Sequence, residues 1–287
     1  MRLGTAEGAL LDAVRHVRWP ARRRAPHGMT GAHLSKALGT SAEFTEHRAY
    51  RQGDEPRRID WKLLARSDRV AVRLSDDRAT LPTVLLVDAS ASMAFPADTL
   101  EKWAFARLVA VGLAAAAHRS GDPVGVTVAA ADGARRLPPR TRPGVVHDVA
   151  RALDALRPSG SPALAPLLAG LRSVPRVAVI TDLLGDADEL LAVAAASRAA
   201  GREVHLVHVV HALEADPPAA PATYADPERP EDRRALTGET RAAYLERFAA
   251  WRTDVAHAWR AAGAWYTEVG AGEAAERAVR RVASGAG

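Results

Sequence analysis

Cysteine is absent from the 287-residue sequence. Disulfide bonds and thiolate metal sites are therefore excluded, and any metal site must use oxygen and nitrogen ligands. No apolar run approaches the roughly 20 residues that span a bilayer, and the N-terminus has no apolar signal core. We therefore expect a cytoplasmic protein without a membrane span.

Two motifs of common enzyme classes are also missing. No Gly-Lys pair occurs anywhere, so the chain lacks the phosphate-binding loop of nucleotide hydrolases. The G-x-S-x-G turn that presents the nucleophile of many serine hydrolases is missing as well. Any ATPase activity is therefore expected to belong to a partner.

Lysine is scarce, with three residues, and arginine supplies nearly all of the positive charge. Residues 1–82 hold 16 Lys and Arg against 10 Asp and Glu, so the basic excess lies in the N-terminal third. We interpret the run from Arg22 to Arg24 as a solvated tract and the arginine content as coding bias. A nucleic-acid partner is not expected, and its signature would be a steep salt dependence of duplex binding.

Hydrophobic periodicity divides the chain into two parts. Residues 1–80 are expected to form a helix, a basic connector and a small module, whereas residues 81–287 alternate strands and helices. This alternation predicts an α/β domain with a doubly wound, mostly parallel sheet and an antiparallel edge strand. The D-x-x-E spacing from Asp98 to Glu101 predicts a helix capping box. Residues 212–238, rich in Pro, Ala and acids, are expected to form an exposed excursion without regular structure.

The residues from Thr83 to Met93 concentrate the candidate chemistry. Val84 to Val87 predict a strand that is buried on both faces, and Asp88, Ser90 and Ser92 follow at its carboxyl end. Alternate residues leaving a strand can point the same way. These three side chains can therefore converge on one ion.

Two further loops are expected at the same edge of the sheet. One loop carries Ser159 and Ser161 between two predicted helices, and the other begins at Asp182, directly after a second buried strand. Carboxylates and hydroxyls form the hard oxygen shell that Mg²⁺ or Mn²⁺ prefers. The predicted metal ligands are Asp88, Ser90, Ser92, Ser161 and Asp182. The alternative interpretation is that these hydroxyls satisfy backbone groups in turns and that the acids merely end strands.

This pattern resembles the metal-ion-dependent adhesion site of von Willebrand factor type A-like domains. The D-x-S-x-S motif of that family matches Asp88, Ser90 and Ser92, and its later strand-end aspartate matches Asp182. Ser161 stands at the position of a loop threonine, and the proline that follows it departs from the family pattern. The resemblance covers about residues 81–283 and implies a metal-dependent protein-binding domain.

The segment before the first buried strand matches a second pattern. Its residues are Arg48, Tyr50, Gly53, Asp54, Arg57, Ile59, Asp60, Trp61, Ala65 and Arg66. Together with the D-x-S-x-S motif, they resemble the bacterial family called domain of unknown function 58. Members of that family are commonly encoded beside a MoxR-type AAA+ ATPase, so the resemblance implies such an ATPase as a partner. Some members carry N-terminal membrane helices, and this chain resembles the soluble branch.

Arginines and acids alternate in this segment, which is the composition of an ion-pair network. Trp61 is expected to anchor the network. Two roles remain open for it: a structural clamp between the small module and the sheet, or a docking surface for an acidic patch on a partner.

Three histidines, His205, His208 and His211, recur at intervals of three on a predicted strand. Because side chains alternate along a strand, the middle one faces away and the outer two lie about 20 Å apart. They cannot share an ion and are expected to be core or surface residues.

These patterns predict a non-enzymatic, metal-dependent module that binds an acidic-residue-bearing protein ligand. It would act as partner or adaptor of a MoxR-type ATPase in the assembly or maturation of a client complex. One alternative is a Mg²⁺-dependent phosphatase of the haloacid dehalogenase type, although that chemistry needs a second acid where this chain has Ser90. The other alternative is a structural adaptor whose metal site is empty.

Overall fold

The computed structural model describes residues 4–22, 30–39, 46–51, 54, 59–67, 69–229 and 231–285. The chain divides into two compact units. The small unit comprises residues 21–81, and the sheet unit comprises residues 1–20 together with residues 82–287. No helix among the residues described is long and apolar enough to cross a membrane.

The sheet unit is built on a six-stranded sheet with the order β11-β8-β7-β4-β5-β6. Its strands are β4 (Thr83–Asp88), β5 (Val124–Ala130), β6 (Gly133–Arg140), β7 (Arg176–Thr181), β8 (Glu203–His211) and β11 (Trp265–Ala271). All neighbouring strands run parallel except β6, which pairs antiparallel with β5 at the edge. The expected mostly parallel α/β sheet with an antiparallel edge strand is confirmed.

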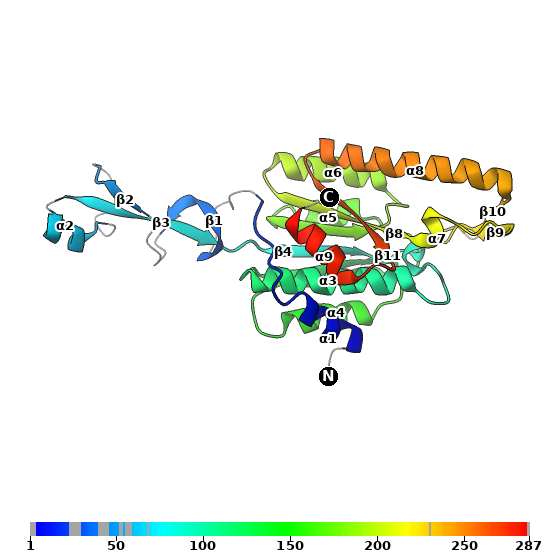
Figure 1. The fold of residues 1–287 in the computed structure, drawn as a ribbon, viewed down its shortest axis with the longest axis horizontal. Helices are drawn as coiled ribbons and strands as arrows, with labels where there is room; N and C mark the ends of the chain where they lie inside the picture. Colours follow the sequence, from blue (N-terminus) through cyan, green and yellow to red (C-terminus); the bar gives the residue numbers. More distant parts are fainter. Residues whose placement is uncertain are drawn as a thin grey trace. The chain divides into compact units, whose positions relative to one another are not determined.

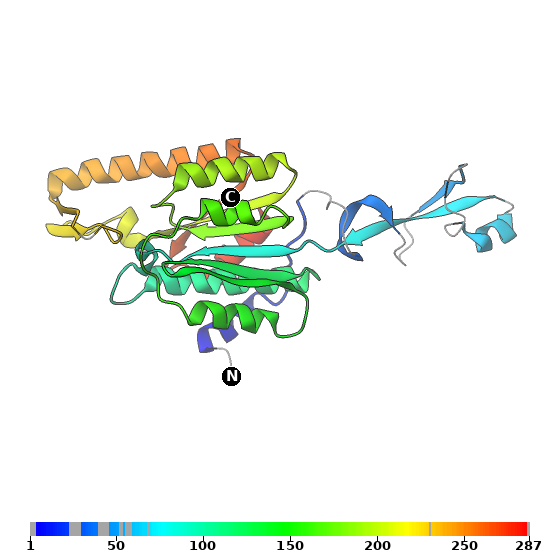
Figure 2. The ribbon, with the colours of Figure 1, turned by 180° about the vertical axis from the view of Figure 1, so that it is seen from behind.

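Helices cover both faces of this sheet (Figures 1 and 2). One face carries α1 (Thr5–Ala13), α3 (Glu101–Arg119), α4 (Val145–Asp154) and α9 (Ala275–Ser284). The other face carries α5 (Ala165–Gly170), α6 (Ala187–Ala199) and α8 (Gly238–Ala261). Each face has its own apolar core, as expected for a sheet that is buried on both sides.

The central strand β4 shows why the apolar run forms a buried strand. All six of its residues are buried. Leu85 and Val87 contribute to the core beneath α3, whereas Leu86 belongs to the opposite core, because side chains alternate between the faces of a strand. The strand ends at Asp88, so its polar continuation lies at the carboxyl edge of the sheet.

The N-terminal helix α1 packs with the sheet unit, although sequence periodicity grouped it with residues 1–80. Leu10 and Val14 are buried in the core beneath α3. Arg119, at the end of α3, donates hydrogen bonds to the carbonyl oxygens of Leu11 and Val14 at 3.1 and 3.0 Å. These contacts join residues about a hundred positions apart, which local periodicity does not register.

The capping box predicted from Asp98 to Glu101 does not form. Helix α3 begins at Glu101 after Leu100, which has a left-handed φ of 55° and makes no side-chain cap. The Asp98 carboxylate accepts a hydrogen bond from the neighbouring Thr99 amide instead. The carbonyl of Phe95 accepts from the Lys102 amide at 3.0 Å, so a backbone group satisfies this donor of the first helical turn.

The excursion predicted to lack regular structure contains a short helix and a hairpin. These are α7 (Ala212–Ala215), β9 (Ala222–Ala225) and β10 (Arg233–Leu236), with β9 and β10 paired antiparallel. Most of their residues are exposed, as predicted. No hairpin was predicted here because neither strand alternates clearly between apolar and polar residues.

The small unit contains a three-stranded antiparallel sheet with the order β1-β3-β2 and one helix. Its elements are β1 (Thr30–Gly39), β2 (Glu46–Ala49), α2 (Trp61–Ser67) and β3 (Ala71–Ala79). The buried Asp60 begins the helix, since its Oδ1 accepts hydrogen bonds from the amides of Lys62 and Leu63, both at 3.0 Å.

The signature residues of this unit are only partly described. Gly53, Arg57 and the side chain of Arg48 lie outside the described residues, as does Arg58. Among the others, Trp61 is 62% exposed and Tyr50 is 37% exposed. The prediction that Trp61 anchors a partly buried network is therefore wrong: it lies at the exposed start of α2. Ile59 and Asp54 are half-buried, and Ala65 and Arg66 are exposed.

Candidate functional site

Asp88 lies at the carboxyl end of β4, between β5 and β7. Its carboxylate is almost entirely buried and accepts two hydrogen bonds. The Ser90 amide donates to Oδ1 at 2.8 Å, and the Thr181 hydroxyl, at the end of the neighbouring strand, donates to Oδ2 at 2.7 Å. These contacts hold the carboxylate at the edge of the sheet where parallel α/β folds bind ligands.

The electrostatics of Asp88 favour a nearby positive charge. Burial, and after it the negative charge of Asp182, raise the pKa of Asp88 to about 7, although hydrogen bonds from Thr181 and Ser90 oppose the rise. Among the described residues, no Lys, Arg or His forms an ion pair with Asp88. A cation bound beside it would stabilise the ionised carboxylate.

Ser90 and Ser92 continue the motif on a short 3-10 helix, Ala91–Ala94. Both side chains are buried, and their hydroxyl oxygens share a hydrogen bond of 2.9 Å. The D-x-S-x-S spacing therefore brings the two hydroxyls together, although a 3-10 helix and not a continuing strand does so, and only Ser90 of the two lines a cavity with Asp88.

The loop that carries Ser161 is tied to this motif by backbone hydrogen bonds. The Ala91 amide donates to the Gly160 carbonyl at 2.8 Å, and the Ser159 amide donates to the Ala89 carbonyl at 2.9 Å. Gly160 has a φ of +63°, and a Cβ placed there would lie 2.8 Å from the Ala131 Cβ. The loop therefore requires glycine at this position to approach the motif.

A small cavity of about 10 Å³ joins these groups. Asp88, Ser90, Ser161 and Thr181 line it, together with Pro162, Leu164, Leu183, Gly185, Asp186, Ala187, Leu190 and Glu228. A volume of roughly 10–15 Å³ is the space that one water molecule needs. The cavity can therefore hold a water molecule or a small cation but no larger ligand.

Asp182, which was expected to bind the metal, is paired with Lys102. It follows β7 directly and is buried, but it does not line the cavity. Its Oδ2 accepts a hydrogen bond of 2.8 Å from the ammonium group of Lys102, and its Oδ1 accepts from the Leu184 amide at 3.2 Å. Direct ligation of a metal by Asp182 thus stays a prediction, and its charge is already matched by a buried lysine.

The fully buried Lys102 was not identified from the sequence. Its ammonium group also forms an ion pair with Glu214 in α7. Burial opposes its charge, but the charges of Asp182 and Glu214 outweigh burial and raise the pKa of Lys102. One signal was available: one of only three lysines in an arginine-rich chain lies next to Trp103 on an otherwise apolar helix face.

Three other polar residues of the cavity were also missed. Thr181 is the last residue of a predicted buried strand, where a hydroxyl beside a strand-end acid could have been noticed. Asp186 accepts hydrogen bonds from the Leu164 and Ala165 amides at 3.3 and 2.8 Å, so it caps the start of α5. Glu228 comes from the loop between β9 and β10, and no local pattern links that loop to the site.

The donor set suits a hard divalent cation. Asp88, Ser90, Ser92, Ser161 and Glu228 offer carboxylate and hydroxyl oxygens without sulfur or imidazole, which is the chemistry that Mg²⁺ and Mn²⁺ select. Within the described ranges, no three His, Asp or Glu side chains are grouped to hold a metal by themselves. A cation here would depend on the serine hydroxyls as well as the carboxylates.

The three histidines of β8 are buried and have separate partners. His205 stacks on Trp265 with ring centres 4.9 Å apart, and His208 Nδ1 lies 2.7 Å from the Tyr266 hydroxyl. His211 Nε2 lies 3.0 Å from Glu101. They were predicted to be core or surface residues, and all three belong to the core.

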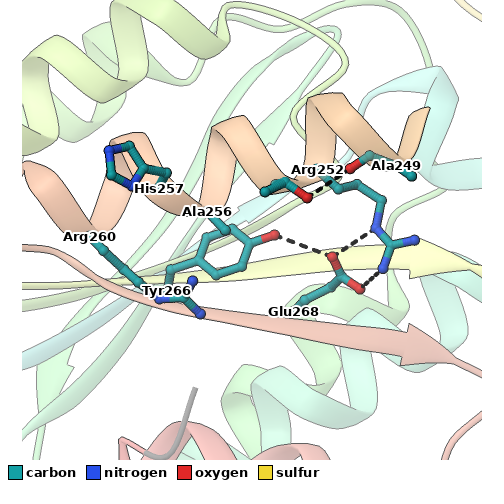
Figure 3. Close-up of a pocket in the computed structure, with 8 residues that line it drawn as sticks. Ala249, Arg252, Ala256, His257, Arg260, Tyr266 and Glu268 are labelled. Atoms are coloured by element: carbon teal, nitrogen blue, oxygen red, sulfur yellow. Dashed lines mark hydrogen bonds and ion pairs between the residues drawn. The ribbon is translucent and has the colours of Figure 1, made fainter. Parts of the chain in front are cut away.

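A larger hollow, about 570 Å³ in volume, lies between α8 and β11 (Figure 3). Glu268 is the acceptor for two of the side chains there: Arg252 Nε donates to Glu268 Oε2 at 2.9 Å, and the Tyr266 hydroxyl donates to the same oxygen at 3.4 Å. The Arg260 guanidinium lies 5.2 Å from the centre of the Tyr266 ring. Because the Glu268 carboxylate is already paired with Arg252, the hollow is a weaker candidate for a cation site than the oxygen cluster.

Curated relatives match about half of this chain. Uncharacterised proteins of Mycobacterium tuberculosis and Mycobacterium bovis are 30% identical over 166 residues, which are 52% of this chain and 52% of each relative. The chain thus spans about half the length of these curated relatives.

Similar solved structures include an aerotolerance-related membrane protein from Bacteroides fragilis, with a TM-score of 0.45 and 17% identity over 71% of this chain and 98% of that one. Another is a von Willebrand factor type A structure from Catenulispora acidiphila, with a TM-score of 0.36 and 18% identity over 50% of this chain and 35% of that one. A manganese-loaded TRAP protein from Plasmodium vivax has a TM-score of 0.37 and 12% identity over 45% and 56% of the two chains. The family model described as "Protein of unknown function DUF58" matches residues 46–254, most of the chain, and this protein therefore belongs to that family.

Proposed function

We propose that this chain is a non-enzymatic protein-binding module that depends on a divalent cation, Mg²⁺ or Mn²⁺. Asp88, Ser90, Ser92 and Ser161 would hold the cation, and Asp182 would bind it only when its ion pair with Lys102 opens. The bound cation would supply an open coordination position for a carboxylate of the protein ligand.

One observation carries this proposal. The buried Asp88 carboxylate and the Ser90 and Ser161 side chains line a single cavity of about 10 Å³ at the carboxyl edge of the sheet. Asp88 has no cationic partner among the described residues, whereas the nearby Asp182 is paired with Lys102. A small cation is the group that matches both the volume and the unbalanced charge.

The cation is tested by calorimetric titration of MgCl₂ and MnCl₂ into the full chain. We expect binding to the wild type and its loss in Asp88→Ala, with circular dichroism and thermal unfolding confirming that the variant is folded. Glu231→Ala, which changes an exposed acid, serves as a matched control. If neither metal produces heat with the wild type, the chain is instead a structural adaptor with an empty site.

We further propose that the protein ligand belongs to an assembly with a MoxR-type AAA+ ATPase in the cytoplasm, where the chain acts as an adaptor in the maturation of a client complex. The family membership supports this partner. The test is co-purification of the chain with the MoxR-type ATPase of the same genome in Mg²⁺ and in EDTA. Equal recovery in both buffers, or equal recovery with Asp88→Ala, would rule out a metal-dependent contact.

A phosphatase mechanism has less support. The residue two positions after Asp88 is Ser90, whose hydroxyl bonds Ser92 and cannot act as a general acid-base carboxylate. The cavity also has room for about one water molecule, which is too little for a phosphoryl group. Metal-dependent hydrolysis of an aryl phosphate that is lost in Asp88→Asn would reverse this conclusion.

A further inference from the structure

Glu228 reaches the candidate cation site from a distant part of the chain. The Ser161 hydroxyl donates a hydrogen bond of 2.5 Å to Glu228 Oε2, across 67 positions of sequence. Glu228 also lines the same cavity as Asp88 and Ser90. A second carboxylate therefore stands at this site beside the one that ends β4.

The local structure around Glu228 presents its side chain in a defined way. Glu228 lies between β9 and β10, where Asp226 Oδ1 accepts hydrogen bonds from the amides of Glu228 and Arg229 at 2.9 and 3.2 Å. The Asp226 amide in turn donates to the Asp232 carbonyl at 2.9 Å. The β9–β10 hairpin, drawn in yellow in Figure 1, carries this turn at the end of the sheet unit where α7 lies.

The base of the hairpin is attached to the rest of the sheet unit. Arg241 Nε in α8 donates to the Pro217 carbonyl at 2.8 Å, and the Tyr244 hydroxyl donates to the Glu214 carbonyl at 2.7 Å. At the tip, Glu228 is half-buried and bonds Ser161. Release of this bond would leave the contacts of the base in place.

No described side chain of opposite charge balances Glu228. In the part of the chain that the structure describes, no Lys, Arg or His side chain forms an ion pair with it. Its neighbour Arg229 pairs with Asp226 and Asp232 instead, each at 3.6 Å. Two carboxylates without cationic partners, those of Glu228 and Asp88, thus line one small cavity.

We propose that Glu228 is an internal carboxylate ligand that closes the cation site, in the position that an acid of the protein ligand would otherwise take. This inference rests on the proposed function and adds a regulatory step to it. A protein ligand must displace the tip of the β9–β10 hairpin before its own carboxylate can bind. The chain is then autoinhibited by its own excursion.

The test uses the full chain, Mn²⁺ as the metal probe and acetate as a soluble carboxylate probe. Calorimetry measures Mn²⁺ affinity, and water-proton relaxation reports the number of water molecules on the bound ion. The variants are Glu228→Ala and the milder Glu228→Gln, with Glu231→Ala as an exposed acid from the same loop. Thermal unfolding confirms that each variant is folded.

We expect Glu228→Ala to weaken Mn²⁺ binding by about tenfold, because one charged ligand is lost. Relaxation per bound ion should rise as water enters the vacated position, and acetate should reduce it again. In the wild type and in Glu231→Ala, acetate should have no effect. The Mn²⁺ affinity of Glu228→Gln should lie between those of the wild type and Glu228→Ala.

Two results would overturn the inference, and they separate it from the proposed function. In the first, Mn²⁺ binds to the wild type and not to Asp88→Ala, but Glu228→Ala gives the same Mn²⁺ affinity and relaxation as Glu231→Ala. Glu228 is then not a ligand, and the cation site stands without it. If Mn²⁺ does not bind to the wild type at all, the cation site and the role of Glu228 fail together.

Discussion

Lys102 Nζ lies 2.8 Å from Asp182 Oδ2, and the exposed fractions of the two side chains are 0% and 3%. The pair joins the first turn of α3 to the end of β7, across 80 positions of sequence. Glu214 in α7 contacts the same ammonium group. One buried cation therefore links the carboxyl edge of the sheet to the start of the excursion.

Lys102→Met should destabilise the protein by about 3–5 kcal/mol, because it leaves buried carboxylate charge without a partner. Urea unfolding followed by circular dichroism measures the loss. Lys62→Met, in the exposed part of α2, is the matched control and should change stability little. The double variant Lys102→Met/Asp182→Asn should lose less stability than the sum of the losses in the two single variants. Strict additivity would show that the pair is not coupled.

Glu203 should contribute to stability at neutral pH and lose that contribution in acid. Burial opposes its ionisation, but the nearby His205 ring and the charge of Arg176 outweigh burial and lower the pKa of Glu203 from 4.5 to about 2. Because the folded pKa is the lower one, the stabilisation is complete above about pH 4.5 and is lost as the pH falls toward 2. The change is on the order of 3 kcal/mol.

The measurement for Glu203 is the free energy of unfolding between pH 6 and pH 2 in the wild type and in Glu203→Gln. The variant cannot ionise at this position, so its stability should fall less steeply below pH 4.5. Parallel curves for the two proteins would contradict the assignment. The wild type should lose more stability in acid because protonation of Glu203 removes its ion pair with Arg176 Nε, which lies 3.1 Å from Glu203 Oε2.

Thr181→Val should lower the free energy of unfolding by about 1–3 kcal/mol, because Asp88 Oδ2 loses its hydrogen-bond donor in a buried setting. The Leu183 amide, which donates to the Thr181 hydroxyl at 3.0 Å, loses its acceptor as well. Thr181→Ser keeps the hydroxyl and should retain most of the stability. Chemical denaturation compares the two, and a Thr181→Val variant as stable as the wild type would show that this hydrogen bond contributes little.

Gly160→Ala should destabilise the loop that carries Ser161 by about 1–2 kcal/mol. The left-handed φ disfavours a side chain, and the added Cβ would meet the Ala131 Cβ at 2.8 Å. Gly8→Ala, within α1 and with open space around it, should be neutral or stabilising. Thermal unfolding distinguishes these outcomes, and a neutral Gly160→Ala would show that the loop can shift without cost.

Local sequence patterns were sufficient for the elements that form the sheet. The apolar run before Asp88 predicted a strand that is buried on both faces, and the alternation of strands and helices predicted a mostly parallel sheet. Both follow from the period of the side chains and from the need to bury apolar surface. The hydroxyls of the D-x-S-x-S motif could also be placed together, because they belong to one short segment.

The capping box at Asp98 and the expected anchoring by Trp61 show the limits of such patterns. Each prediction used residue type and spacing alone. In the folded chain the carbonyl of Phe95 takes the amide of Lys102, and Trp61 lies exposed at the start of α2. Which donor meets which acceptor depends on the path of the backbone, and several paths satisfy the same spacing.

Local hydrophobic pattern sets where strands end, so the collection of acids and hydroxyls at the carboxyl edge of a parallel sheet could be predicted from the residues alone. The pairing of Asp182 with Lys102 and the contact of Glu228 with Ser161 became visible in the folded chain. Those pairs join segments 80 and 67 residues apart. Contacts of that range depend on how helices and loops cross in space, which no local pattern of residues specifies.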